Sequence, residues 1–170
     1  MYFTTYASLI GEMLIAGDDE SICRVSFCGQ KHFPSYDDFT RKDDLPIFDD
    51  VKNWFDDYFK GLNPKINFKL NPQGTEFRLK VWKILSEISY GETLTYGEIA
   101  SMISDTMSAQ AVGGAVGHNP ICIIVSCHRV VGANGSLTGY GGGIMRKKML
   151  LELEGADMSR FTIPKKGTAL

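Results

Sequence analysis

Residues 95–117 of this 170-residue chain are TYGEIASMISDTMSAQAVGGAVG. The segment predicts two short helices with a tight turn between them, because the first helix can begin at Thr95 or Tyr96 and Ser108 is a good N-cap for the second. Such a pair is a helix-turn-helix unit, whose second helix enters a groove of DNA. The same geometry is common in helical domains that bind no nucleic acid, so the shape alone leaves both interpretations open.

The second predicted helix, residues 109–117, is poor in side chains. Gly113, Gly114 and Gly117 each cost about 1 kcal/mol of helix stability relative to alanine. This cost indicates that something approaches the helix closely. A neighbouring helix that packs tightly against it is one interpretation, and the minor groove of DNA, about 6 Å wide, is the other. On the second interpretation the DNA-contacting residues are Ala109, Gln110, Ala111, Gly113 and Gly114.

A cysteine stands ten residues after this helix, in Ser126-Cys127-His128-Arg129-Val130. The apolar run Ile121–Val125 predicts a strand buried on both faces, with Cys127 at its carboxyl end. Neighbouring cationic groups favour the thiolate, which is the nucleophilic form of cysteine. Most buried cysteines are inert core residues. The glycine-rich segment 132–143, which lets backbone approach a flat ligand, favours a reactive site here.

Together these features indicate an enzyme that acts on a nucleic-acid base. The reactive atoms of a base in duplex DNA are hidden in the stack, so such an enzyme flips its target into a pocket. Flipping requires a side chain that fills the vacated stack, a push on the backbone and an aromatic pocket wall. We assign these three parts to Gln110, Tyr96 and Tyr140, in that order.

The first 72 residues predict a separate half of the chain. After it, Thr75 is a plausible N-cap for a helix over residues 76–88. The elements predicted within the first half are a β-meander over 2–8, 12–16 and 22–27, a polar loop through Pro34 and Pro46, an amphipathic helix over 47–60, and a last strand plus linker within 63–74.

Composition and charge restrict the class of protein. A hydrophobic fraction of 44% and a charged fraction of 22% are ordinary for a soluble globular chain. No apolar run approaches the ~18–20 residues of a membrane span, so we expect a cytoplasmic protein. Residues 1–72 carry 12 acidic and 8 basic side chains, and residues 73–170 carry 8 and 10. The second half can therefore accept a polyanion, but without strong salt-driven affinity.

The four cysteines agree with a reducing compartment, because they form no C-x-x-C pair. Cys23, Cys28 and His32 could supply three zinc ligands. The sequence offers no convincing fourth ligand, so we expect no bound metal. Cys122 is expected to be a small core residue.

The second half resembles a known family, the O6-alkylguanine-DNA alkyltransferases, also called methylated-DNA–protein-cysteine methyltransferases. The resemblance is dense over about residues 75–157 and loose over the first 70. The matching residues are Phe77, Val81-Trp82, Tyr90-Gly91-Glu92-Thr93, Thr95-Tyr96, Ala111-Val112-Gly113-Gly114-Ala115, Asn119-Pro120, Cys127-His128-Arg129-Val130-Val131, Gly139-Tyr140, Leu150-Leu151 and Glu154-Gly155.

The resemblance implies an α+β fold in two domains. Residues 1–72 would form a ribonuclease-H-like domain of structural role, with a small antiparallel sheet and a helix. Residues 73–170 would form a helical, winged-helix-like domain that binds DNA through its helix-turn-helix and carries the catalytic cysteine. The implied protein is a monomer that repairs alkylated double-stranded DNA, acts once and needs no cofactor.

The resemblance also implies a role for each matching residue. Cys127 would attack the alkyl carbon on O6 of guanine and keep the alkyl group as a thioether, and O4-alkylthymine would be a further substrate. His128, oriented by Glu154, would draw the proton from Cys127 through a water. Asn119 would hydrogen-bond the turn between the recognition helix and the active site. The base pocket would be formed by Tyr96, Val130, Tyr140 and Gly141.

Two residues depart from the family pattern. Ser126 stands where the family commonly has proline, so the turn before Cys127 loses a fixed φ and gains a hydroxyl. Gln110 stands where an arginine often fills the vacated stack. Glutamine can fill space and hydrogen-bond the orphaned base, but it brings no charge. Arg129 would tie helices together and take no part in the chemistry.

Three other functions compete with the alkyltransferase. A non-enzymatic protein of the same fold that binds alkylated bases would lack the nucleophilic cysteine, and Cys127 is present. A Cys-His-Glu thiol hydrolase would leave the helix-turn-helix and its glycine-rich second helix unexplained. A transcriptional regulator would need a fused module, for which we expect no room in 170 residues.

Overall fold

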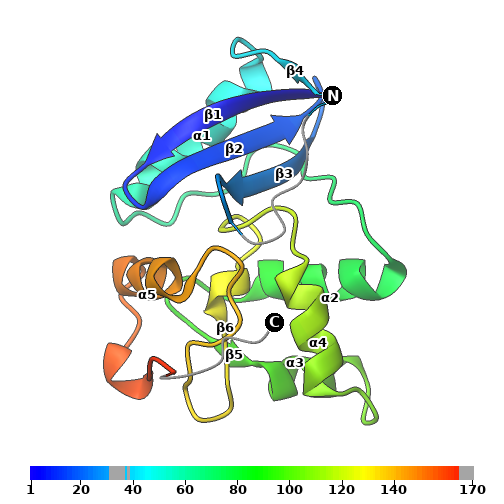
Figure 1. Ribbon diagram of the computed structural model, residues 1–170, viewed down its shortest axis with the longest axis vertical. Helices are drawn as coiled ribbons and strands as arrows, with labels where there is room; N and C mark the ends of the chain where they lie inside the picture. The colour runs from blue at the N-terminus through cyan, green and yellow to red at the C-terminus, as the bar shows by residue number, and fades with distance from the viewer. Residues whose placement is uncertain (31–36, 38, 165–170) are drawn as a thin grey trace. The chain divides into compact units, whose positions relative to one another are not determined.

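The computed structural model describes residues 1–30, 37 and 39–164, and it divides into two compact units, Met1–Gln73 and Gly74–Leu170. Unit 1 is a sheet with a helix across it, and unit 2 is mainly helical (Figure 1). This is the α+β class expected from the sequence. Among the described residues, no helix is long and apolar enough to cross a membrane.

The predicted β-meander is present in unit 1. Tyr6 of its first strand stacks on Phe55 of helix α1 (Pro46–Phe59), with 5.3 Å between ring centroids, so the helix turns aromatic side chains toward the sheet. The helix begins at a proline, whose missing N–H needs no partner in the first turn. The antiparallel strands are β1 (Tyr2–Ser8), β2 (Gly11–Gly17) and β3 (Ile22–Phe27).

Two predictions for unit 1 are wrong. The segment expected as a polar loop contains a short strand, β4 (Thr40–Arg41), which pairs parallel to β1, so the sheet order is β3-β2-β1-β4 and the sheet is mixed. Residues 63–74 contain no strand, and Leu70 makes only a single bridge to Ile22. Pro72 has no N–H with which to extend that pairing. The predicted loop residue Pro34 lies outside the described residues.

The three helices predicted after the linker are confirmed, and each begins at a polar N-cap. In all three, the side-chain oxygen of the cap accepts a hydrogen bond from the backbone N–H three residues further on, which satisfies a donor that a helix leaves unpaired. Thr95 and Glu98 form a complete capping box. The helices are α2 (Glu76–Glu87) after Thr75, α3 (Tyr96–Ile103) after Thr95, and α4 (Ala109–Gly117) after Ser108.

Helices α3 and α4 form the helix-turn-helix, and α2 holds α4 in place. Trp82 of α2 donates from Nε1 to the carbonyl of Ala115 in α4 at 2.8 Å, in a buried contact. β5 (Leu94–Thr95) pairs parallel with β6 (Val130–Val131), which brings the start of α3 beside the residues that follow Cys127. The remaining elements are the 3-10 helices η1 (Cys127–Arg129) and η2 (Met158–Arg160) and the helix α5 (Ile144–Leu153).

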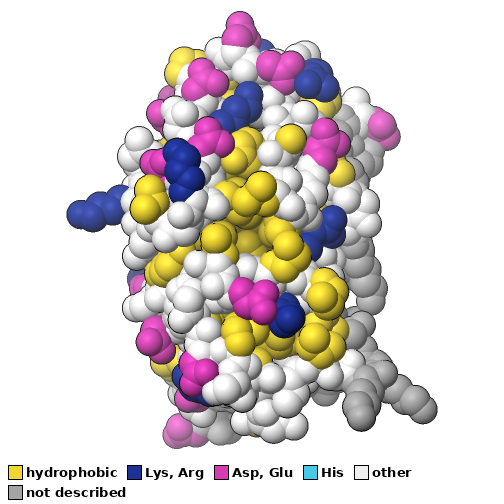
Figure 2. Space-filling view, turned by 90° about the vertical axis from the view of Figure 1, so that its left-hand side faces the viewer, with side chains coloured by type: hydrophobic (Ala, Val, Ile, Leu, Met, Phe, Trp, Pro, Cys, Tyr) yellow, Lys and Arg dark blue, Asp and Glu magenta, His cyan; other side chains and the backbone are white. Residues whose placement is uncertain are grey.

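Charged side chains of both signs are mixed on the surface. On the face drawn in Figure 2, Lys and Arg side chains stand among Asp and Glu side chains and form no single basic field. With a formal net charge of −2, the chain offers few cations for DNA affinity driven by counterion release.

Candidate active site

The turn before the cysteine differs from the prediction. Ile121–Val125, expected as a buried strand, form a tight turn in which Ile124 N donates to Cys122 O at 2.9 Å and Val125 N donates to Ile121 O at 3.0 Å. All five side chains are buried. A strand buried on both faces has the same apolar composition, so the sequence could not separate the two. Ile123 has a φ of 69°, a conformation that costs a β-branched residue roughly 1–3 kcal/mol.

Asn119 holds this turn together. It follows α4 after a single capping residue, His118. Its Nδ2 donates to Val125 O at 2.8 Å and to Ile121 O at 3.3 Å, and its Oδ1 accepts from Ile121 N at 3.0 Å. The same Nδ2 lies 3.0 Å from Sγ of Cys127. One amide therefore joins the end of α4, the turn and the thiol.

Cys127 begins η1 and is only 6% exposed. Burial raises the pKa of its thiol, although the hydrogen bond from Asn119 and the positive charge of Lys147 act in the opposite direction. A neighbouring cation therefore favours the thiolate, in the direction expected from the sequence, but burial outweighs it. The resting site holds a thiol, and a base must take its proton before the sulfur can attack.

His128 and Glu154 form a buried pair beside the cysteine. Nε2 of His128 lies 2.7 Å from Oε1 of Glu154, and both side chains are fully buried. Arg129 donates from Nε and Nη2 to the two oxygens of the same carboxylate, each at 2.9 Å. Its Nη1 donates to the carbonyl of Ile88, the residue that ends α2. Arg129 thus ties the end of α2 to the end of α5, which is the structural role predicted for it.

Burial favours the neutral form of the His128 imidazole. Burial lowers the pKa of His128, even though the Glu154 carboxylate pulls in the other direction. Burial alone would raise the pKa of Glu154, but the hydrogen bonds and charges of His128 and Arg129 outweigh it, and the pKa lies below its ordinary value. Because an ionised carboxylate only accepts, the geometry assigns the ring proton to Nε2 and the accepting lone pair to Nδ1. A neutral imidazole oriented in this way is suited to act as a general base.

A cleft of about 530 Å³ lies beside α4. The hydroxyl of Tyr96 donates to Thr138 O at 3.1 Å and to Gly139 O at 3.3 Å at the side of this cleft. Burial raises the pKa of Tyr96, so its phenol is a donor at neutral pH. Ala111, the other residue predicted to contact DNA, is exposed on the same helix. The lining residues are Tyr96, Ala109, Gln110, Gly113, Gly114, Thr138 and Gly139.

Internal packing does not explain two of the glycines in α4. A Cβ on Gly114 would meet no heavy atom of the described residues within 4 Å. A Cβ on Gly113 would meet the Tyr96 ring at 3.8 Å, which is an ordinary van der Waals distance. A neighbouring helix therefore does not force glycine at either position, and the interpretation that remains is a partner that approaches from outside.

Not all of the residues predicted for the base pocket line the cleft. Val130 and Tyr140 are buried at 0% and 7% exposure and do not line the cleft, whereas Tyr96 does. Gly141 is partly exposed, and a Cβ there would have open space around it among the described residues.

The partner of the Ser126 hydroxyl was not predicted. Ser126 precedes Cys127 and is buried, and its Oγ donates to the carbonyl of Leu85 in α2 at 2.5 Å. The hydroxyl therefore anchors the cysteine turn to a carbonyl near the end of α2. The only signal in the sequence was the departure from proline at this position.

Lys147 of α5 was also missed. Its side chain is fully buried, and its Nζ donates to Val130 O at 2.5 Å and to Thr138 O at 2.6 Å. The sequence did hold a signal. Lys147 lies three and four residues before Leu150 and Leu151, which are buried, so it occupies the apolar face of the helix.

A second hollow in the described part of the chain contains none of the predicted site residues. A hollow of about 540 Å³ over α2 is lined by Lys80, Lys83, Ile84, Glu87, Ile88, Leu94 and Met102. No group of His, Cys, Asp and Glu side chains among the described residues is arranged to hold a metal ion. His32, considered with Cys23 and Cys28 as a zinc ligand, lies outside the described residues.

The fold and the site define a class: a protein with a helix-turn-helix that is followed by a buried cysteine beside a His–Glu pair. Two family models match the chain. The ribonuclease-like domain of 6-O-methylguanine DNA methyltransferase matches residues 1–72, and the DNA binding domain of the same family matches residues 76–156.

Individual relatives agree with the family models. A methylated-DNA–protein-cysteine methyltransferase of Haemophilus influenzae is 44% identical, over 91% of this chain and 86% of the relative. One of Methanosarcina acetivorans is 45% identical, over 92% and 99%. The crystal structure of the Mycobacterium tuberculosis OGT in complex with DNA has a TM-score of 0.83 and 43% identity, with 95% of each chain covered. The chain belongs to the 6-O-methylguanine DNA methyltransferase family, the methylated-DNA–protein-cysteine methyltransferases of DNA repair.

Proposed function

We propose that this protein flips an O6-alkylguanine out of duplex DNA into the cleft beside α4 and transfers the alkyl group to Cys127. Support comes from the position of the cleft, which opens next to Gly113 and Gly114, where the lack of side chains on α4 leaves room for DNA to approach. O4-alkylthymine is a second substrate in this proposal, because it also carries its alkyl group on an exocyclic oxygen. The protein acts as a monomer, with residues 1–72 in a structural role and residues 73–170 in binding and chemistry.

The first chemical step in the proposal is removal of the thiol proton. His128 accepts it through a bridging water at Nδ1, and Glu154, held by Arg129, stabilises the imidazolium that forms. Asn119 donates to Sγ of Cys127 at 3.0 Å, and a hydrogen bond to the charged form favours that form.

The thiolate then attacks the alkyl carbon. The new S–C bond forms as the C–O6 bond breaks, and the electron pair of the broken bond stays with the base. The guanine takes up one proton at its ring, which Tyr96 donates and regains from solvent, while the proton from Cys127 leaves through His128. The net change moves one proton from the thiol to the base. A thioether is not hydrolysed at a useful rate, so each molecule acts once.

Two residues assist flipping in the proposal. Gln110 is exposed at the start of α4 and enters the gap left in the base stack. Tyr96 crowds the phosphate of the target nucleotide from the other side of the cleft. Extruding a base costs a few kcal/mol, which the inserted side chain offsets in part.

The contact between Asn119 and Cys127 is the observation on which the proposal rests most. It joins the end of the helix that lines the cleft to the sulfur that accepts the alkyl group. A hydrolase or a lesion-binding protein has no need for a nucleophile tied to its DNA-contacting helix.

A stoichiometry assay tests the proposed function. The protein is incubated with an excess of duplex that carries one O6-methylguanine with a labelled methyl group. We expect one methyl group per protein molecule, an unmodified guanine in the DNA, and no transfer by Cys127→Ser, which should still bind the duplex. Repeated turnover, or label released into water, would contradict the proposal. Binding without transfer by the unaltered protein would instead identify a non-enzymatic lesion-binding protein.

A further inference from the structure

The loop between α2 and β5 reaches the buried carboxylate of Glu154. The backbone N–H of Gly91 donates to Oε2 of this carboxylate at 3.3 Å, and Nε of Arg129 donates to the same oxygen at 2.9 Å. Oε1 accepts from Nε2 of His128 at 2.7 Å and from Nη2 of Arg129 at 2.9 Å. Each oxygen thus accepts from at least two donors, so a turn of the carboxylate about its last bond would break hydrogen bonds on both.

The backbone at position 91 requires glycine for two reasons. Its φ is 78°, in the left-handed region that residues with a Cβ rarely adopt. A Cβ on Gly91 would also lie 2.8 Å from the carbonyl oxygen of Glu154, which is too close for an ordinary contact. A side chain at this position would therefore push the loop away from the end of α5, and the N–H would leave the carboxylate.

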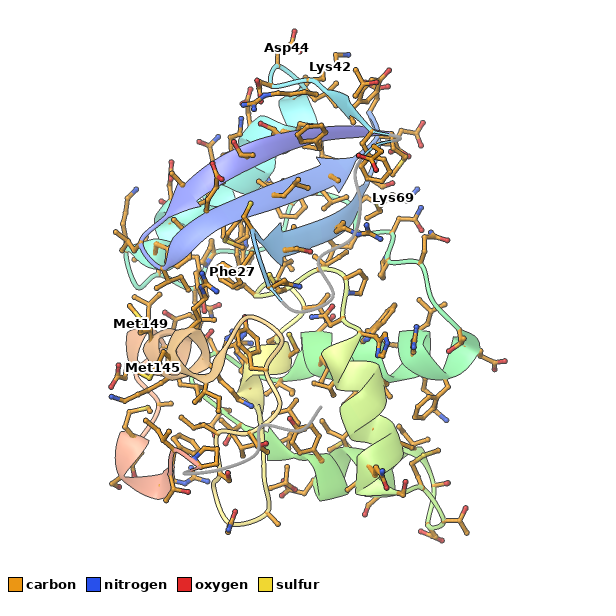
Figure 3. The ribbon with its side chains drawn as sticks, in the orientation of Figure 1. Phe27, Lys42, Asp44, Lys69, Met145 and Met149 are labelled. Carbon is orange, nitrogen blue, oxygen red and sulfur yellow. The ribbon has the colours of Figure 1, made fainter. Side chains whose placement is uncertain are left out.

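Tyr90 holds the same helix end from a second side. Its hydroxyl donates to Leu153 O, at the last residue of α5, at 3.4 Å. Its ring faces the guanidinium of Arg129, with 5.7 Å from Cζ to the ring centroid. Met145 and Met149, labelled in Figure 3, are 59% and 44% exposed on the same helix. The loop therefore contacts the carboxyl end of α5 and leaves the side that carries these methionines open.

The shape of the turn does not by itself explain where the N–H of Gly91 points. A positive φ at the third of four residues is what a type II turn requires, and glycine usually supplies it. The hydrogen bond that closes this turn comes from the next residue, because Glu92 N donates to Ser89 O at 3.0 Å. The N–H of Gly91 is not needed for the turn, and it is directed at a buried charge instead.

We propose that Gly91 is a positioning residue of the alkyl transfer, whose N–H fixes the carboxylate of Glu154 and, through it, the imidazole of His128. The inference rests on the proposed function, because it concerns the base that takes the thiol proton. The titratable and charged groups that face the carboxylate are His128 and Arg129 of η1 and Tyr90 of the loop. Without the N–H the carboxylate stays bound to Arg129 but turns, and His128 loses its fixed acceptor.

Replacing the amide of Gly91 by an ester tests the proposal. Glycolic acid at position 91 keeps the left-handed backbone and adds no Cβ, but it removes the donor. The matched control is the corresponding ester at Glu92, which removes the turn's own hydrogen bond and leaves the carboxylate untouched. Single-turnover transfer from an O6-methylguanine duplex should fall about tenfold or more with the ester at Gly91, a part of what a general base contributes. The control should lose little.

Gly91→Ala is a second variant, which serves if the ester gives no cooperative unfolding transition. It should slow transfer at least as much, because its Cβ displaces the loop. Gly61→Ala is its control, since Gly61 has a φ of 81° and a Cβ there would meet no heavy atom of the described residues within 4 Å. Both alanines strain the backbone, but only the change at Gly91 should alter the rate.

Two kinetic readouts separate positioning from a purely structural role. In a His128→Ala background the change at Gly91 should cause no further loss, because the base is already absent, whereas a structural defect would multiply the two losses. The loss in the presence of His128 should also shrink in alkali, where the thiol ionises without a base.

The proton on Nε2 of His128 gives a readout that needs no DNA. Its nuclear magnetic resonance signal in protein with isotope-labelled histidine is identified by its absence in His128→Ala. Either change at Gly91 should speed its exchange with water, and the controls should not. Exchange and transfer rates that match the controls, or losses that multiply with His128→Ala, overturn the proposal. If the unaltered protein takes no methyl group from the duplex, the proposed function fails, and the exchange rate still decides whether Gly91 holds the carboxylate.

Discussion

Asn119 and Cys127 are joined by a hydrogen bond of 3.0 Å from the side-chain amide of one to the sulfur of the other. Asn119 stands two residues after α4, so a shift of that helix is passed to the sulfur through one rigid amide. The same amide holds both ends of the turn before Cys127. If α4 contacts DNA as proposed, that contact is mechanically linked to the position of the nucleophile.

Asn119→Ala should weaken both the fold and the reaction. The turn would lose its side-chain hydrogen bonds in a buried region, which should lower the free energy of unfolding by about 1–3 kcal/mol. Transfer should slow by about tenfold or more, since Sγ loses a donor. Urea unfolding and single-turnover transfer measure the two effects. Asn134→Ala is the control, because Asn134 is exposed and accepts a local hydrogen bond from Ser136 N. Transfer at full rate by Asn119→Ala would remove this residue from the mechanism.

Ser126→Ala should destabilise the protein by about 1–2 kcal/mol, because the buried Leu85 carbonyl loses a donor. Ser126→Pro should lose less, since the φ of −76° at Ser126 suits proline, and a fixed φ compensates for the missing hydrogen bond. Chemical denaturation of both variants checks the order. Ser101→Ala, which removes an exposed hydroxyl from α3, should change little. An alanine variant as stable as the parent would show that the hydroxyl contributes nothing.

His128→Ala should slow transfer by about 10²–10⁴, the usual contribution of a general base. In the unaltered protein the pKa of His128 is lowered from 6.5, so the neutral base persists as the pH falls to that value. The rate should therefore change little from about pH 8 to pH 6.5 and decline only at lower pH. Rapid-quench measurements across this range provide the profile. His118→Ala, which alters the cap of α4, is the control. A decline that begins above pH 7 would contradict a neutral buried His128.

In the proposed function, Gln110 determines how well the vacated stack is filled. Gln110→Arg should bind alkylated duplex more tightly and with a steeper salt dependence, because arginine adds cation–π stacking and attraction to phosphates. It should react at least as fast as the parent. Gln110→Ala should bind and react more slowly on duplex DNA.

Free O6-benzylguanine provides the control for Gln110, because a free base needs no flipping. Gln110→Ala should react with it at nearly the parent rate. Equal losses on duplex and on free base would show that Gln110 supports the fold, and would weaken the assignment of residues 108–117 to the DNA-contacting surface.

The sequence predicted best where local rules decide the structure. Each of the three predicted N-caps begins the helix expected of it, because a side-chain oxygen at this position accepts a hydrogen bond from an unpaired backbone N–H of the first turn. The caps are Thr75, Thr95 and Ser108. The meander of unit 1 follows from alternation and turn residues in the same way. The family resemblance, carried by the motifs around Cys127, was confirmed over both halves of the chain.

The predictions from the sequence failed where tertiary contacts determine the local structure. Ile121–Val125 are apolar because they are buried on all sides, and a buried turn stabilised by a distant amide has the same composition as a buried strand. The short strand β4 has only two residues and depends on pairing with β1. Lys147 was overlooked because a lysine is normally solvated, although its place on the apolar face of α5 marked it.

Mass spectrometry of the intact and digested protein after incubation with an O6-methylguanine duplex tests the central claim most directly. A single methyl group, about 14 Da, should appear on the peptide that contains Cys127, since this thiol has both an amide donor and the His128–Glu154 pair beside it. The same duplex with an unmodified guanine should add no mass. A methyl group on Cys23, Cys28 or Cys122 with none on Cys127, or no added mass at all, would contradict the account.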